Sequence, residues 1–206
     1  LSLSVSQPNV LVVAEQSPYK TFQDFLKAVK ANPGKITFGS AGVGTGQHMT
    51  GELFKLTTKL DIPHIPYKGS TPALTDLMGG QVQMMFASIP SVLPQVKSGQ
   101  INAIAMGSAK RVSSLPDIPT LSESGVPGFE AYSWAGMLAP AKTPKDIVAR
   151  LNKEIVDILK QKDVADTLNL QGAIPVGDTP EQFAAYVKAE MSKWGAVVKS
   201  ANIKAD

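Results

Sequence analysis

The chain has 206 residues, of which 43% are hydrophobic and 18% charged, as is typical of a globular protein with a packed core. Its net charge is only +3 with dispersed lysines and arginines, so no nucleic-acid groove is expected, and no apolar run approaches the roughly 20 residues that cross a bilayer, so no direct membrane insertion is expected either. Zero cysteines exclude thiolate chemistry, and only two histidines remain as candidate metal ligands. We therefore expect neither a metal nor any other cofactor.

The first half of the chain alternates strand-like and helix-like segments. The β-branched run Asn9–Ala14 predicts a strand buried on both faces. Thr21, with Asp24 three residues later, predicts a capping box for a helix that ends near residue 32. Further strands are expected at residues 35–38, 62–66, 82–86 and 101–106, with helices from residues 46, 72 and 91. Because neighbouring parallel strands need crossover connections, this order predicts a parallel sheet covered by helices.

Residues 40–48, here called the anion loop, join a strand to a helix through a glycine-rich turn. Thr45 is the expected cap of that helix, whose first turn would offer unpaired N–H groups to a carboxylate or a phosphate. A Walker loop is excluded because no lysine follows Gly44, and a dinucleotide fingerprint is disfavoured because Gln47 stands where its third glycine belongs. The alternative is that these glycines only make a tight turn.

Two other turns are expected at the same edge of the sheet as the anion loop. They are residues 67–71, with Tyr67, Lys68 and Thr71 as the expected cap of the helix that follows, and residues 87–91. Ligands of such sheets bind beyond the carboxyl ends of the strands, so three turns together indicate a ligand site. Lys68 either supplies a positive charge to a carboxylate or is simply solvated, and Tyr67 either lines the pocket or packs at the end of its strand.

An enzyme is the main alternative to a binding protein. Ser40 and His48 would serve as nucleophile and base of a hydrolase. No G-x-S-x-G elbow surrounds the serine, however, and no acid is placed by a motif to orient the histidine. We therefore expect a protein without catalytic residues.

The second half of the chain is mostly helical. A strand is expected at 130–139, helices at 143–160 and 163–170, a short strand at 173–176, and a last helix that begins with a capping box at Thr179. The helices carry apolar stripes, such as Ile147, Leu151 and Ile158. These stripes need a sheet to cover them and this half supplies few strands, so we expect that their partner lies outside the chain.

These residues resemble the Bug family, the substrate-binding proteins of tripartite tricarboxylate transporters. The resemblance covers essentially the whole chain and is carried by five motifs: Phe38-Gly-Ser-Ala-Gly-Val-Gly-Thr-Gly-Gln-His48, His64-Ile-Pro-Tyr-Lys-Gly69, residues 73–82, residues 106–111 with 115–120, and residues 175–183. It implies an α/β type II periplasmic binding protein fold, with one complete parallel-sheet lobe and the helical C-terminal part of the other lobe.

The resemblance further implies a periplasmic receptor that closes two lobes over a small carboxylate and delivers it to membrane subunits of the TctA and TctB type. Residues 1–11 would be an incoming hinge segment, 12–130 the ligand-binding second lobe, and 131–206 the returning part of the first lobe. The family's N-terminal third has no counterpart in this chain, nor is a signal peptide present. Some relatives act instead as ligand sensors for a signalling partner, and the sequence does not separate the two roles.

The resemblance also implies which residues bind the ligand. In many relatives the residue at position 87 is an acid suited to a ligand's amine; here it is Ala87, which argues against an amino-acid ligand. Trp134 lies where the chain returns to the first lobe and would pack on the ligand or on the hinge. The implied ligand-binding set is Ser40, Ala41, Gly42, Gly44, Thr45, His48, Tyr67, Lys68, Gly69, Ala87, Ser88 and Trp134.

Overall fold

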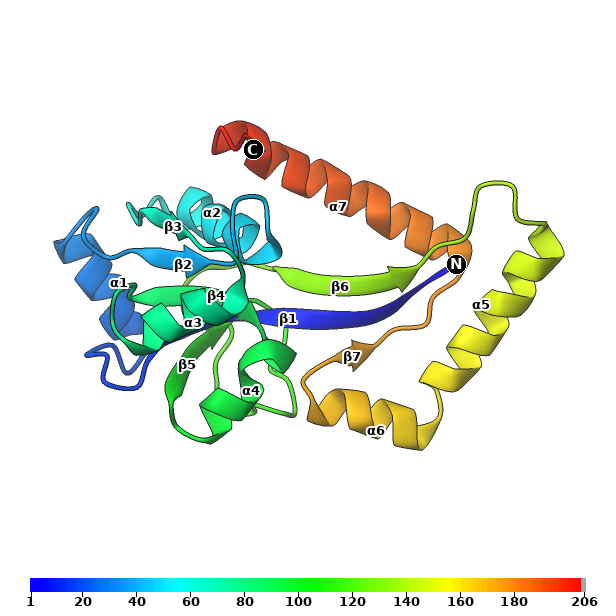
Figure 1. The fold of residues 1–206 in the computed structure, drawn as a ribbon, viewed down its shortest axis with the longest axis horizontal. Coiled ribbons are helices and arrows are strands. Elements are labelled where there is room, and N and C mark those ends of the chain that lie inside the picture. The colour runs from blue at the N-terminus through cyan, green and yellow to red at the C-terminus, as the bar shows by residue number, and fades with distance from the viewer. Residues whose placement is uncertain (205–206) are drawn as a thin grey trace.

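The computed structural model describes residues 1–204, which form a seven-stranded mixed sheet and seven helices (Figure 1). The strands are β1 (Ser2–Ala14), β2 (Phe38–Ser40), β3 (His64–Pro66), β4 (Met84–Ser88), β5 (Ile101–Met106), β6 (Tyr132–Met137) and β7 (Ile174–Pro175). The helices are α1 (Phe22–Ala31), α2 (Gly46–Thr58), α3 (Ser70–Met78), α4 (Ile89–Lys97), α5 (Lys145–Leu159), α6 (Lys162–Leu170) and α7 (Pro180–Ser200).

The second half of β1 and the strands β2 to β5 form one part of the sheet, called the first unit here. Its strand order is β3-β2-β4-β1-β5. β2 pairs in parallel with β3 and β4, as the alternation of strands and helices predicts. β1 pairs antiparallel with both β4 and β5, so the expectation of an all-parallel sheet is wrong for this strand. A connecting helix does not by itself make two strands parallel. α1 joins β1 to β2, yet β1 runs opposite to β2 and β4 and lies between β4 and β5.

β1 is thirteen residues long, more than twice the predicted strand at residues 9–14. Its first half leaves the unit and pairs antiparallel with β6, from Ser2 opposite Met137 to Pro8 opposite Tyr132, and with β7 at Val5 and Ser6. Figure 1 shows β1 and β6 running side by side from the first unit to the C-terminal helices. The two strands therefore connect the two parts of the chain.

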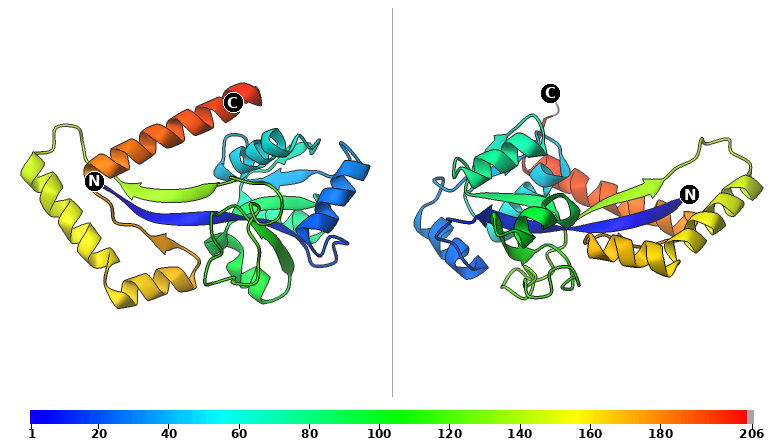
Figure 2. Two further views of the ribbon diagram at one scale, coloured as in Figure 1. Left: turned by 180° about the vertical axis from the view of Figure 1, so that it is seen from behind. Right: turned by 60° about the horizontal axis from the view of Figure 1, so that its bottom comes forward.

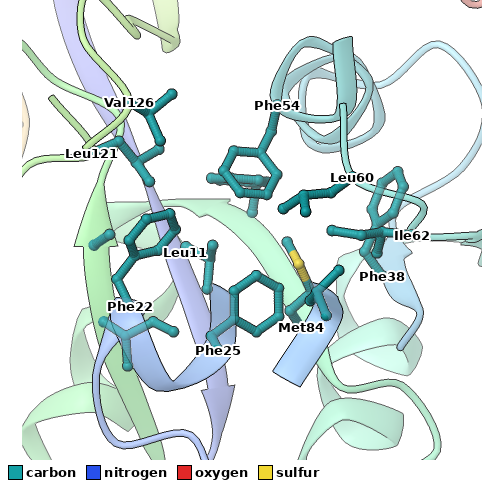
Figure 3. Close-up of a cluster of buried hydrophobic side chains, with 14 of the residues drawn as sticks. Leu11, Phe22, Phe25, Phe38, Phe54, Leu60, Ile62, Met84, Leu121 and Val126 are labelled. Atoms are coloured by element: carbon teal, nitrogen blue, oxygen red, sulfur yellow. The ribbon is translucent and has the colours of Figure 1, made fainter. Parts of the chain in front are cut away.

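The core lies on both faces of the sheet, because successive side chains of β1 point to opposite sides. Leu11 and Val13 belong to a cluster with Phe25 and Phe54 (Figure 3), whereas Val10 and Val12 pack into a second cluster on the other face. All four β1 side chains are fully buried, as expected of a strand covered on both sides. Each such side chain contributes roughly 1.5–3 kcal/mol of burial free energy, which fixes the sheet under the anion loop.

Helix starts follow the sequence signals at three of four predicted caps. Thr21 and Thr179 each form a complete capping box, and Thr45 caps α2. The prediction of Thr71 as the cap of α3 is wrong, because the helix begins at Ser70 with Gly69 as its cap. Gly69 has a φ of 118°, a backbone conformation that glycine adopts readily, and this allows the chain to enter the helix two residues earlier.

The C-terminal helices expose much of their apolar surface. α5 has no buried residue, and Ile147 and Leu151 keep 46% and 41% of their surface exposed. In α7, Phe183 packs on β6 whereas Met191 is 71% exposed. α7 extends from the far end of β6 back to α2, as two further views show (Figure 2). Within residues 1–204, no other segment fully covers the apolar stripes of these helices.

Candidate functional site

The carboxyl ends of three parallel strands meet at one edge of the sheet. β2, β3 and β4 end at Ser40, Pro66 and Ser88, and the helices α2, α3 and α4 begin shortly after. A cavity of about 170 Å³ lies between the three helix starts. It is lined by Gln47, Ser70, Thr71, Leu74, Met85, Ala87, Ser91, Val92 and Gln95. The predicted convergence of three turns is therefore confirmed.

Most N–H groups of the anion loop are already bonded inside the protein. Ala41 N donates to the Gln47 side chain (2.8 Å), Gly42 N to Ser40 Oγ (3.1 Å) and Gly44 N to His48 Nδ1 (3.0 Å). Thr45 N donates to the Gly42 carbonyl and His48 N to Thr45 Oγ1. The expectation that the N–H groups of these residues are unpaired is wrong, because short polar side chains within the loop satisfy them locally.

Three backbone donors remain in this stretch. Across residues 1–204, no hydrogen bond engages the N–H of Val43, Gly46 or Gln47. Gly46 and Gln47 are the first two residues of α2, where an α-helix has no internal partner for its N–H groups. These donors and the positive end of the helix dipole form the anion-binding group that the structure retains.

The two histidine rings stack on each other beneath the anion loop, with ring centroids 3.9 Å apart. His48 is only 5% exposed, and Ser40 is fully buried with its Oγ 2.6 Å from His64 Nε2. Ser40 thus contacts His64 rather than His48, its expected partner in a hydrolase. Burial lowers the pKa of His64 to about 4 and also lowers the pKa of His48, so both rings are neutral near pH 7. His64 was not predicted as a site residue. Its position in the strand expected next to the anion loop could have indicated that its side chain lies near Ser40.

A larger cavity, of about 800 Å³, opens beside the anion loop. Val43, Gly44 and Gly46 form one wall, and the other walls come from α2, β6, α7 and the residues that follow α7. The residues of these other walls are Met49, Tyr132, Ser133, Trp134, Trp194, Val198 and Ile203. Trp134 lines this cavity and also packs edge-on against Phe183 and Tyr186 of α7. Its expected contact with the ligand or the hinge stays a prediction.

The remaining candidate residues lie around the same edge. Tyr67 donates its hydroxyl to Asp76 (2.7 Å), and burial with this carboxylate neighbour raises the pKa of Tyr67 to about 12. Lys68 is exposed, and Gly69 N donates to the Ala41 carbonyl, which fastens the second turn to the first. Ala87 is fully buried but lines the smaller cavity. Ser88 caps α4 and its carbonyl accepts a bond from Ser91 Oγ (2.7 Å).

Residues 1–203 match the model of the tripartite tricarboxylate transporter family receptor. The chain belongs to this family. Over 197 residues it is 36% identical to Protein BugT of Bordetella pertussis, covering 96% of this chain and 60% of BugT. The chain spans about 60% of the length of the curated relatives that it matches first.

Two solved structures place the receptor fold among periplasmic binding proteins. Rpa4515 of R. palustris, solved with adipate, superposes with a TM-score of 0.89 at 34% identity, covering 98% of this chain and 67% of Rpa4515. The periplasmic binding protein BugD superposes with a TM-score of 0.84, also at 34% identity, covering 98% of this chain and 68% of BugD. The predicted α/β fold of periplasmic binding proteins is thus confirmed, and the chain spans 67% and 68% of these two structures.

Two further features of the described residues bear on the site. Within residues 1–204, no three His, Asp or Glu side chains are grouped so that they would hold a metal ion. No helix in this part of the chain combines the length and the apolar character that a membrane span requires.

Proposed function

We propose that this chain is part of a periplasmic receptor that captures a small carboxylate for delivery to a transporter of the tripartite tricarboxylate type. The observation that carries the proposal is the set of unbonded N–H groups of Val43 in the anion loop and of Gly46 and Gln47 at the start of α2. Val43 and Gly46 border the larger cavity, and Gln47 borders the smaller one. Backbone donors at a helix start suit a negatively charged carboxylate and need no lysine or arginine.

The composition of the cavity walls supports a ligand with an uncharged body. Trp134, Tyr132 and Met49 present aromatic and apolar surface beside the donors. At the smaller cavity the residue at position 87 is an alanine, so this wall offers no carboxylate to a ligand ammonium group. A dicarboxylate or an aromatic acid therefore fits these walls better than an amino acid does.

In this proposal residues 12–130 form the ligand-binding lobe. Residues 1–11 lead into this lobe as a hinge segment, and residues 131–206 lead back out of it to a second lobe. The paired strands β1 and β6 connect the two lobes. Long paired strands suit a hinge, because small changes in their twist move the two ends relative to each other. Capture then consists of binding and lobe closure, and delivery requires contact with membrane subunits of the TctA and TctB type.

No bond is made or broken in this function, and the geometry of Ser40 supports that view. Its hydroxyl is buried and bonded to His64 and the Gly42 backbone, so it is not presented to either cavity. Within the described chain, no carboxylate lies in hydrogen-bond contact with the His64 ring to complete a triad. A colorimetric esterase screen tests this directly, and turnover that disappears in Ser40→Ala would reverse the assignment.

Native mass spectrometry of the protein expressed from its complete reading frame, purified without denaturation, tests the ligand class. We expect a bound carboxylic acid that lacks an amino group. Calorimetry with adipate, malate, benzoate and aspartate then ranks the classes. Tight binding of aspartate without binding of the other three acids would contradict the proposed ligand class.

A further inference from the structure

The two stacked histidines control the direction of N–H groups in the anion loop. His48 Nδ1 accepts the N–H of Gly44 at 3.0 Å. Ser40 Oγ accepts the N–H of Gly42 at 3.1 Å and is itself held by His64 Nε2 at 2.6 Å. Both glycine N–H groups therefore point into the protein, while those of Val43, Gly46 and Gln47 have no internal partner among residues 1–204.

This arrangement requires a neutral His48. A ring nitrogen accepts a hydrogen bond only through its lone pair, so Nδ1 of His48 carries no proton while Gly44 N donates to it. Protonation would place two N–H groups face to face and break the contact. The turn would then lose its Gly44 contact and keep the others, among them those of Thr45 Oγ1 and Thr45 N, both of which donate to the Gly42 carbonyl.

His64 stacks on the His48 ring, and burial lowers the pKa of His48 so that this ring is neutral. The rings stack nearly parallel, with 17° between their planes, and the Phe38 ring also stacks with both, its centroid 4.7 Å from that of His64 and 6.4 Å from that of His48. Two cationic rings at this separation would repel strongly in a buried position, so both rings are favoured in the neutral form. This stacking holds the plane of the His48 ring, and the hydrogen bond from Gly44 N selects Nδ1 as the atom that faces the loop.

The charged groups around the pair come from α2. Glu52 Oε1 lies 3.8 Å from His48 Nε2 and 2.8 Å from Lys55 Nζ, and Lys55 in turn lies over the Phe38 ring. Glu52 favours protonation of His48, whereas Lys55 and burial oppose it. β2 and β3 contribute only Phe38, Ser40 and His64 itself to these contacts in the described chain.

We propose that His48 and His64 are positioning residues for carboxylate capture: as a neutral stacked pair they hold the Gly42 and Gly44 N–H groups inward and leave the neighbouring donors for the ligand. The part of this inference that concerns the ligand depends on the proposed function. The part that concerns the loop does not, and it is testable on the protein without any ligand.

The first test follows the Gly44 amide by NMR in three forms of the full chain. His48→Asn keeps an acceptor near the Nδ1 position but does not titrate, whereas His48→Leu removes the acceptor. We expect hydrogen exchange at Gly44 to be about three- to tenfold faster in His48→Leu than in the natural chain, and near the natural rate in His48→Asn. The Leu11 amide in the central strand serves as the control, and its exchange should be equal in all three forms.

The pH dependence separates positioning from simple packing. In the natural chain the Gly44 amide signal should shift with the same midpoint as the His48 ring nitrogens, and in His48→Asn it should stay constant over that range. The proposed loop geometry would be refuted if the Gly44 amide shift did not change over the pH range in which the His48 ring titrates. It would also be refuted if this shift changed equally in His48→Asn.

The second test links the loop to capture, with adipate as the probe. Its affinity should fall in the natural chain as the His48 ring is protonated, and should stay level in His48→Asn. If the Gly44 signal titrates while adipate affinity does not, the histidines shape the loop but do not position it for binding. Absence of adipate binding at neutral pH would count against the proposed ligand class, and the Gly44 titration would still decide the loop geometry.

Discussion

Gly44 and Gly80 share the same backbone φ of 76°, and at both positions an added Cβ would meet no atom within 4 Å. They differ in surroundings, because Gly44 lies in the anion loop beside the larger cavity and Gly80 follows the end of α3. Substitutions at the two glycines therefore carry the same backbone strain and differ only in what lies nearby. This makes Gly80 a matched control for the proposed site.

Gly44→Asp should weaken carboxylate binding much more than Gly44→Asn. The two side chains have nearly the same shape and both tolerate a positive φ, so the difference isolates the added negative charge beside the proposed donors. We expect about a tenfold or greater difference in the dissociation constant for adipate, which corresponds to roughly 1.4 kcal/mol. Equal affinities of the two variants, or the same loss in Gly80→Asp, would contradict the location of the site.

Stability should depend on pH through His64. Its pKa is about 4 in the folded chain and 6.5 when unperturbed, so the unfolded chain binds more protons between these values. The contribution of His64 to stability is complete above pH 6.5 and is lost as the pH falls from 6.5 through 4. Urea unfolding of the natural chain and His64→Gln at about pH 7 and about pH 4.5 measures this. Carboxylates titrate in both proteins, so the comparison isolates His64. Between the two pH values the natural chain should lose more stability than His64→Gln, and an equal loss would show that His64 is not held neutral.

Two helical glycines should respond oppositely to replacement by alanine. An added Cβ at Gly51 of α2 would lie 2.2 Å from a ring carbon of Phe38, whereas at Gly195 of α7 it would meet no atom within 4 Å. Gly51→Ala should destabilise by about 1–3 kcal/mol, because helix and strand must separate, although the helix propensity of alanine recovers part of this. Gly195→Ala should stabilise by roughly 0.5–1 kcal/mol. Unfolding midpoints of both variants check the pair, and a stable Gly51→Ala would mean that Phe38 moves aside.

The sequence was sufficient for features that depend on local chemistry. The capping boxes at Thr21 and Thr179 and the buried run of β1 from Asn9 onward have their causes within a few residues, and the structure confirms them. The first half of β1 was missed because its alternation of leucine or valine with serine is typical of a strand exposed on one face, which is a weaker signal than a continuous apolar run.

Long-range pairing explains the errors at the site. The bond between Ser40 and His64 joins residues 24 positions apart, and it depends on the parallel register that sets Ser40 of β2 beside Pro66 of β3. Glycine spacing predicted a loop suited to anions but not which of its N–H groups are used internally. That choice was set by the side chains of His48, Gln47 and Ser40, whose directions follow only from the folded structure.

The side-chain amide of Asn9 should contribute strongly to the free energy of unfolding, because it joins three elements, β1, α2 and β6. Its Nδ2 donates to Thr50 Oγ1 at 2.9 Å, its Oδ1 accepts from Ser133 Oγ at 3.1 Å, and the side chain is buried with 1% exposure. Asn9→Leu should destabilise by about 1–3 kcal/mol, since two hydroxyl groups lose a partner in a buried position.

The matched comparison adds Thr50→Val to that variant. Removing both partners of a buried hydrogen bond costs less than removing one, so Asn9→Leu/Thr50→Val should be more stable than the sum of the two single variants predicts. Urea unfolding of the four proteins gives the coupling energy, which we expect to be about 0.5–1.5 kcal/mol. Additive effects would show that the Asn9–Thr50 contact contributes nothing of its own.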